Sequence, residues 1–130
     1  MSYHVIDPDD LDPMPDRDAD AFSVSDAADL ETLGMRLYVA APGQMIPLAF
    51  HYHDEQEEAF YVVAGTLHVE TPDRVYAVDP GQVFVAEPGS PHRAFNAEDA
   101  TEPLRVLALG APSVDDAHVY EGEVWNDRDV

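Results

Sequence analysis

Cysteine and lysine are both missing from this sequence of 130 residues. Without cysteine the chain forms no disulfide and offers no thiolate as a nucleophile or a metal ligand. Without lysine all positive charge rests on six arginines, against 27 acidic residues, and the formal net charge is -21. Such a surface repels polyanions, which excludes nucleic acids and anionic membrane faces as partners. The sequence also lacks a signal peptide pattern and any run of about 18 apolar residues, so we expect a cytoplasmic protein.

The acidic residues are spread along the whole chain and are not gathered in one tail. Carboxylates hold water and ions, and their repulsion keeps a protein soluble where salt screens charge. Hydrophobic residues make up 45% of the chain, which is normal for a folded domain and argues against disorder. We interpret the composition as halophilic, similar to that of haloarchaeal proteins. The alternative is an acidic protein that needs its charge for a cationic partner.

Glycine and proline turns divide the middle of the chain into short apolar segments. We predict strands at 35–40, 59–64, 66–70, 75–78, 82–86 and 104–109. The segment 66–70 follows 59–64 directly after Gly65, and we expect the two to pair as a hairpin. Short strands separated by turns every 8–12 residues or so are typical of an all-β sandwich or barrel.

The two ends of the chain differ from this middle part. Residues 7–20 contain three prolines and show no usable period, and the chain beyond 111 is acidic and rich in turn residues. A helical turn is expected only within 26–33. The expected organisation is an acidic N-terminal arm with the first strands at 1–34, a β-barrel at 35–110 and an acidic tail at 111–130.

Two histidines two positions apart, His51 and His53, are the first candidates for chemistry. Side chains alternate faces along a strand, so both imidazoles point the same way, roughly 6–7 Å apart along the chain, and can share a metal ion. Glu58 reaches the same side only if residues 54–57 form a turn or bulge. A third histidine, His92, follows a tight turn rich in glycine and proline.

Both clusters resemble the two sequence motifs of the cupin family. The first motif is matched by His51, His53, Glu58 and Gly65, and more loosely by Gly43. The second motif is matched in register by Gly81, Gly89, His92 and Asn96. Glu87 stands where the family has a proline, which alters a turn without touching a ligand position. The resemblance extends from Met35 to about Leu109.

The resemblance implies a double-stranded β-helix, or jelly-roll barrel, that holds one divalent transition metal per chain. The implied ligands are His51, His53, Glu58 and His92. Glu57 is an alternative carboxylate, but the six-residue spacing to Gly65 favours Glu58. Three imidazoles and one carboxylate suit Mn, Fe, Co, Ni or Zn. Four protein ligands on an octahedral ion leave two positions open, for Lewis-acid or dioxygen chemistry.

Apolar residues near the motifs are candidates for the wall around such an ion and favour a small, largely apolar organic ligand. They are Phe60, Val62, Phe84, Phe95 and Met45. His68 alternates with its apolar neighbours, so we expect it to face solvent. His4 and His118 lie in the chain ends and are not expected to be ligands, and residues 54–57 are read as a solvated turn.

Three functions fit this site. The first is a metal-dependent enzyme, a dioxygenase or an isomerase acting on a small molecule. The second is a metal- or metabolite-binding module without turnover, because a fold alone never names a reaction. The third, a metal-independent sugar epimerase, does not need the intact ligand set. We expect a homodimer, since small cupin barrels commonly pair and the apolar segment 3–6 can add to the edge of a neighbouring sheet.

Overall fold

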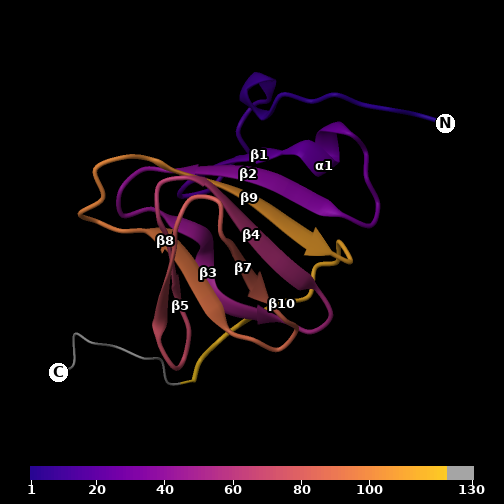
Figure 1. Ribbon diagram of the computed structural model, residues 1–130. Coiled ribbons are helices and arrows are strands. Elements are labelled where there is room, and N and C mark those ends of the chain that lie inside the picture. The colour runs from indigo at the N-terminus through magenta and orange to yellow at the C-terminus, as the bar shows by residue number, and fades with distance from the viewer. Residues whose placement is uncertain (123–130) are drawn as a thin grey trace.

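The computed structural model describes residues 1–122, and of residues 47–49 only the backbone. Two antiparallel five-stranded sheets face each other across the core (Figure 1). The first sheet contains, in spatial order, β1 (Asp20–Ser23), β2 (Gly34–Ala40), β9 (Leu104–Ala111), β4 (Glu57–Ala64) and β7 (Val83–Ala86). The second contains β10 (Ala117–Val119), β3 (Met45–His53), β8 (His92–Asn96), β5 (Leu67–Glu70) and β6 (Val75–Val78). The predicted all-β jelly-roll class is confirmed.

Helical structure is limited to two short turns within residues 1–122. They are the 3-10 turn η1 (Pro8–Asp10) and the helix α1 (Val24–Ala27). The side chain of Ser23 accepts a hydrogen bond from the N–H of Asp26 and so caps α1. The helical turn therefore begins earlier than the expected 26–33. No helix in the described part of the chain is long and apolar enough to span a membrane.

The predicted hairpin of 59–64 with 66–70 is wrong, because β4 and β5 lie in different sheets. The chain crosses between the sheets at Gly65, which has a φ of +80°. A Cβ atom at this position would lie 3.0 Å from the Cα of Leu104 and 3.0 Å from the carbonyl oxygen of Pro103. The crossing thus needs glycine both for its backbone angle and for its close packing.

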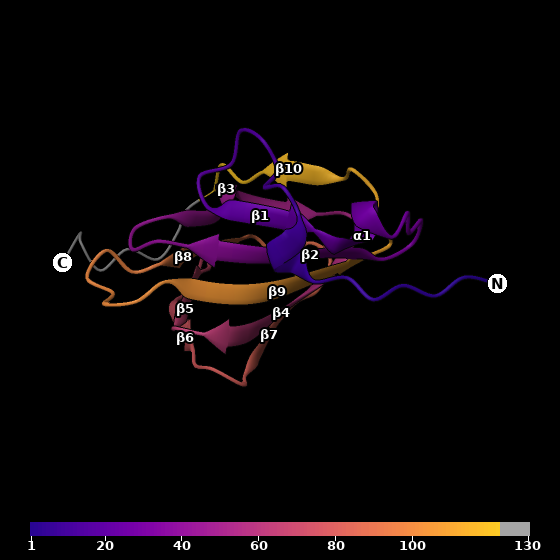
Figure 2. The same ribbon diagram turned by 90° about the horizontal axis from the view of Figure 1, so that it is seen from above.

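Segments outside the expected barrel at 35–110 contribute strands too: β1 lies in 1–34, where first strands are expected, and β10 lies in the expected tail. β1 pairs with β2, and β10 pairs with the end of β3, where Ala117 lies opposite His53 and Val119 opposite His51. Seen from above, β1 and β10 lie on the same side of the molecule and β6 and β7 on the other (Figure 2). β1 therefore extends the first sheet at its edge, and β10 extends the second sheet beside the two histidines of β3.

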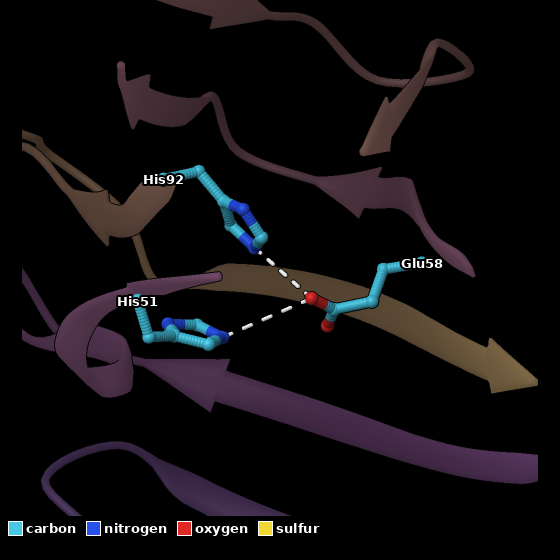
Figure 3. Close-up of side chains that lie close together, drawn as sticks. All are labelled: His51, Glu58 and His92. Atoms are coloured by element: carbon cyan, nitrogen blue, oxygen red, sulfur yellow. Dashed lines mark ion pairs between the residues drawn. The ribbon is translucent and has the colours of Figure 1, made fainter. Parts of the chain in front are cut away.

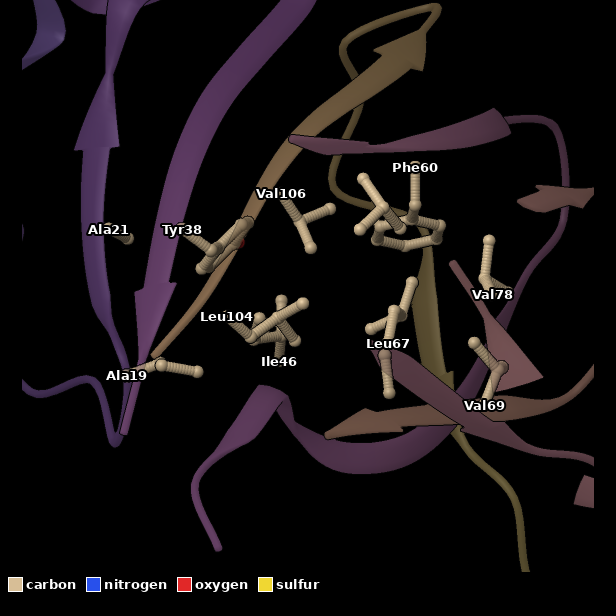
Figure 4. Close-up of a cluster of buried hydrophobic side chains, with 13 residues drawn as sticks. Ala19, Ala21, Tyr38, Ile46, Phe60, Leu67, Val69, Val78, Leu104 and Val106 are labelled. Carbon is tan, nitrogen blue, oxygen red and sulfur yellow. The ribbon is translucent and has the colours of Figure 1, made fainter. Parts of the chain in front are cut away.

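The apolar core fills the space between the two sheets (Figure 4). Its largest fully buried apolar side chains are Phe60, Ile46, Leu67, Leu104, Val62, Val69 and Val106. Burial of one such side chain contributes about 1.5–3 kcal/mol. The ring centroid of Phe60 lies 6.0 Å from that of His92, so the core ends where the histidines begin.

The motif residue Asn96 supports this core. Its side chain is buried, and its amide nitrogen donates to the carbonyl oxygens of Ala40, at 3.0 Å, and Glu102, at 3.2 Å. Its own backbone N–H donates to the carbonyl of Gln44. Asn96 therefore joins the end of β2 to the segments that precede β3 and β9.

Candidate metal centre

Three strands bring the four predicted ligands together. His51 and His53 lie at the end of β3, and His92 begins β8, directly opposite His51 in the register of the second sheet. Glu58 lies at the start of β4 in the first sheet and points across to the histidines (Figure 3). The expected alternation holds along β4, where Phe60 is buried and Glu57 is exposed. The geometry therefore favours Glu58 over Glu57.

A single carboxylate oxygen is the centre of the cluster. Oε1 of Glu58 lies 2.9 Å from Nε2 of His53, 3.1 Å from Nε2 of His92 and 3.8 Å from Nε2 of His51. Ligand atoms of His51, Glu58 and His92 all lie within 4.8 Å of one another. None of the four side chains is more than 13% exposed, so the cluster is largely screened from water.

The second ring nitrogen of two of these histidines is held by an acceptor. Nδ1 of His92 lies 2.9 Å from the carbonyl oxygen of Ser90, and Nδ1 of His53 lies 2.8 Å from a carboxylate oxygen of Asp116. A carbonyl or carboxylate oxygen only accepts, so Nδ1 donates in both rings. In the neutral rings the proton is therefore on Nδ1, and the lone pair on Nε2 points into the cluster.

The donor atoms in the cluster fit a divalent metal ion. Nε2 of His53, Nε2 of His92 and Oε1 of Glu58 are buried, and none has a hydrogen-bond partner in good geometry. Two nitrogen lone pairs and a carboxylate oxygen that face one another repel unless a cation lies among them. A set of imidazole and carboxylate ligands suits Mn, Fe, Co, Ni or Zn.

The pKa values in the cluster show the same attraction for positive charge. Burial alone would raise the pKa of Glu58, but contact with His92 and the charges of the other two histidines hold it below its usual value. Burial likewise works to lower the pKa of His92, and Glu58 with the Ser90 carbonyl raises it instead. Each shift follows from a carboxylate buried beside imidazoles.

Asp116 is a functional candidate that the sequence analysis missed. One carboxylate oxygen binds His53, and the other accepts from the N–H groups of Glu55, at 2.7 Å, and Gln56, at 3.0 Å. Burial alone would raise the pKa of Asp116, but these three donors lower it to about 2. No local signal distinguishes it from the exposed Asp115 next to it in the acidic C-terminal segment.

The turn before His92 connects the two motifs. Residues 87–90 form a turn in which the N–H of Ser90 donates to the carbonyl of Glu87, with Pro88 second and Gly89 third at a φ of +78°. This is the pattern of a type II turn. The N–H of Gly89 also donates to the carbonyl oxygen of His53 at 2.7 Å. Glu87 in place of the family's proline therefore leaves the turn closed.

A cavity of about 640 Å³ lies beside the cluster. Its wall includes His51, His53, Glu58 and Phe60, and also Arg36 and Tyr38. Phe84 packs near His92 and lines a second hollow of about 740 Å³ instead. Val62 belongs to the core and has no exposed surface.

Two predicted wall residues, Phe95 and Met45, are wrong. In β8 the side chains of His92, Ala94 and Asn96 are buried, so Phe95 points out of the sheet. Met45 is its cross-strand partner in β3 and shares that outer face. A β-bulge in β3 between 46 and 51 shifts the register, so Met45 and His51 lie on opposite faces of the strand although six positions separate them.

The remaining histidines also lie on outer faces. His68 points away from the core, as expected, but it stacks on Phe95 with ring centroids 5.7 Å apart and is only half-exposed. His118 lies 2.6 Å from Asp54 through its Nε2 atom, and its ring packs on Tyr52. His4 is exposed in the N-terminal segment.

Comparisons with known proteins agree with this fold. The cupin domain pattern matches residues 36–110. A proposed sugar phosphate isomerase from Acidithiobacillus ferrooxidans is 28% identical, with a TM-score of 0.67 over 76% of this chain and 62% of the other. The present chain thus spans less than two thirds of that protein.

Two further solved structures align over more of both chains. A sugar phosphate isomerase of the cupin superfamily from Silicibacter pomeroyi is 23% identical, with a TM-score of 0.77 over 92% of this chain and 83% of the other. The polyketide cyclase RemF from Streptomyces resistomycificus is 19% identical, with a TM-score of 0.75 over 94% and 89%. No curated protein matches the chain. Because the cupin domain pattern covers more than half of the chain and the architecture agrees with it, the protein belongs to the cupin domain family.

Proposed function

We propose that the protein is a metal-dependent enzyme, an isomerase or a dioxygenase, acting on a small organic molecule. The observation that carries this proposal is the convergence of three imidazole nitrogens on Oε1 of Glu58, beside a cavity of about 640 Å³ that His51, His53 and Glu58 line. Sugar phosphate isomerases and a polyketide cyclase among the similar structures support an enzyme on this scaffold.

In this proposal His51, His53, Glu58 and His92 hold one divalent transition metal. When bound, such an ion polarises a substrate oxygen as a Lewis acid. The protein supplies the rest. Phe60 closes the inner end of the site with an apolar ring that excludes water, and the remaining cavity wall holds the substrate in position.

The test is a screen for turnover by the metal-loaded protein. Oxygen uptake and isomer formation are followed on pools of small metabolites, with the variant His92→Ala as the metal-deficient control. Turnover by the parent alone supports the enzyme. Retention of metal and of a small ligand without turnover by any pool would favour the alternative, a non-catalytic binding module.

We also propose that two copies of the chain form a homodimer. β7 is an edge strand of the first sheet, and its side chains Val83 and Val85 are 52% and 60% exposed. Tyr61 and Val63 on neighbouring β4 continue this apolar patch. A second copy seated on the patch would remove it from water and cover the strand edge.

The charge of -21, with exposed acidic residues throughout the chain, supports a further proposal about where the protein works. Dense carboxylates repel one another in dilute buffer, and concentrated salt screens that repulsion. We propose a halophilic protein of a salt-rich cytoplasm.

A further inference from the structure

The chain has six arginines and no lysine, and most of the arginines in the described residues have partners. Five arginines lie within the described residues 1–122. Three of them are engaged: Arg93 with Glu70 at 3.1 Å, Arg105 with Asp9 at 3.3 Å, and Arg74 over the ring of Tyr76 at 4.3 Å. Within the same residues Arg17 and Arg36 form no ion pair, although the chain has 27 acidic residues. The two without partners are the two that line the cavity beside the metal centre.

The strand register shows which way Arg36 points. Arg36 on β2 lies opposite Ala108 on β9, and Ala108 lies opposite Phe60 on β4. Cross-strand partners share a face of the sheet, and Phe60 is a core residue, so this row faces inward. Arg36 is half-buried. Its strand β2 is separated from β4 by β9, so the backbones of β2 and β4 lie about 10 Å apart.

The next row along the same sheet leads to the carboxylate of the cluster. It consists of Gly34 on β2, Gly110 on β9 and Glu58 on β4. The two glycines bring no side chain of their own into this row, but the side chain of Gln56 lies over Gly110, where an added Cβ would come within 2.8 Å of its Cδ atom. Arg36, Gln56 and Glu58 all line the same cavity, so a molecule of a few carbon atoms that extends from Arg36 to the centre passes the Gln56 amide.

A guanidinium without an ion-pair partner at the wall of a cavity is suited to one kind of ligand. It is always charged and offers a planar fork of N–H donors that matches two oxygens of a carboxylate or phosphate. We propose that the cavity binds a small organic anion, with its carboxylate or phosphate on Arg36 and its other end at the metal centre. Arg17, exposed at the rim, adds positive charge where the anion enters. The proposal rests on the function proposed above and names its substrate class.

The acidic residues of the cavity wall do not cancel this charge. Asp116 is already occupied by His53 and two backbone N–H groups. Asp26 and Asp115 are exposed, and in molar salt their repulsion of an anion is screened within about 3 Å. Binding should accordingly be measured in molar KCl.

Three probes that share a carbon skeleton test the proposal: glycerol 3-phosphate, glycerate and neutral glycerol. Calorimetric titration of the parent should show binding of at least one of the two anions and none of glycerol. Comparison of the two anions shows whether phosphate or carboxylate is the preferred group. Failure of both anions to bind the parent would overturn the proposal.

Matched arginine variants locate the site. Arg36→Gln should weaken anion binding at least tenfold, while Arg105→Gln, which removes the same charge outside the cavity, should leave it within twofold of the parent. Arg36→Lys keeps the charge but not the fork and should bind with intermediate affinity. Equal anion affinity in Arg36→Gln and Arg105→Gln would sink the assignment, provided that melting curves show both variants folded.

Metal content separates this proposal from the one on which it rests. Arg36→Gln should retain as much metal as the parent, because Arg36 is not a ligand. If the parent binds the anion through Arg36 but holds no metal, the metal-dependent function fails and the anion site stands. If the parent holds metal but does not bind the anion, the anion site fails and the metal-dependent function stands.

Discussion

His53 and Asp116 are hydrogen-bonded at 2.8 Å although 63 positions separate them in the chain. The same carboxylate receives the N–H groups of Glu55 and Gln56, in the turn between β3 and β4. One side chain thus orients an imidazole and shapes the turn that leads to Glu58. A carboxylate behind a histidine in this way fixes the tautomer and makes Nε2 a better metal ligand.

Asp116→Asn should therefore weaken metal binding by about 10- to 100-fold. The amide still accepts from His53, but its NH₂ group then faces the backbone donors of the turn. Affinity is measured by competition with a chromophoric chelator, and the absorption spectrum of the cobalt-loaded protein reports the geometry. Asp115→Asn is the control, because Asp115 is exposed next to Asp116 and has no part in the contact with His53. Indistinguishable affinities in the two variants would remove Asp116 from the site.

Purified protein should contain close to one divalent transition metal per chain. The double variant His51→Ala/His92→Ala should lose it, and His4→Ala/His118→Ala, which removes two histidines outside the cluster, should keep it. Elemental analysis after preparation without chelator or tag-derived metal decides the matter. Equal metal content in the first double variant and the parent means that the ligand set is wrong. Removal of the metal from the parent should also lower the melting temperature, because the ion binds only the folded state.

Gly65→Ala should destabilise the fold more than Gly81→Ala. Both glycines have positive φ, +80° and +85°, so alanine costs each about 1–2 kcal/mol of backbone strain. Only at Gly65 would the new Cβ also meet backbone atoms at 3.0 Å, since nothing lies within 4 Å of one at Gly81. Denaturant unfolding of the two variants gives the difference directly. Equal losses would show that the crossing between sheets relaxes to admit a methyl group.

Metal-free protein should melt at a higher temperature as KCl rises from 0.1 M to 3 M. The Debye length falls from about 10 Å at 0.1 M to about 3 Å at 1 M, so repulsion among the carboxylates becomes local. The compact state concentrates this repulsion more than the unfolded chain does and gains more from screening. A melting temperature that stays flat over this range would leave the acidic surface without a role in salt adaptation.

In molar salt the protein should sediment as a dimer, at twice the chain mass of 14.3 kDa. Val85→Asp places a charge in the exposed patch on β7 and should shift the equilibrium to monomer. Val119→Asp is a control with a similarly exposed valine on β10. A parent mass near 14.3 kDa at all accessible concentrations contradicts the dimer.

Local signals in the sequence predict β2, β4, β5, β6, β7 and β9 to within two residues at each end, whereas β1, β3, β8 and β10 are absent from the predicted strands. The turns at Gly81 and Gly89 mark strand ends because positive φ is a local property of glycine. Spacing within a strand likewise places His51 and His53 on one face. Local signals of this kind do not show which distant segments of the chain pair with each other.

Long-range pairing accounts for the parts that were missed. β5 follows β4 in the chain yet pairs with β6 and β8, which no local pattern reveals. Asp116 and Arg36 acquire their roles only when β10 joins β3 and β2 joins β9. The bulge in β3 has the same effect on Met45. The five steps from Ile46 to His51 lie opposite only two in β8, from Ala94 to His92, and an odd number of extra residues reverses the faces of all those before it.

The proposed metal ligands come from both sheets, with Glu58 on one and the three histidines on the other. An ion bound by all four residues would connect the two sheets at this end of the barrel. Any opening that separates the sheets at this end would have to break the bond between such an ion and Glu58. If the protein binds the proposed ion, the rate at which the metal leaves would therefore also measure how often this end of the barrel opens.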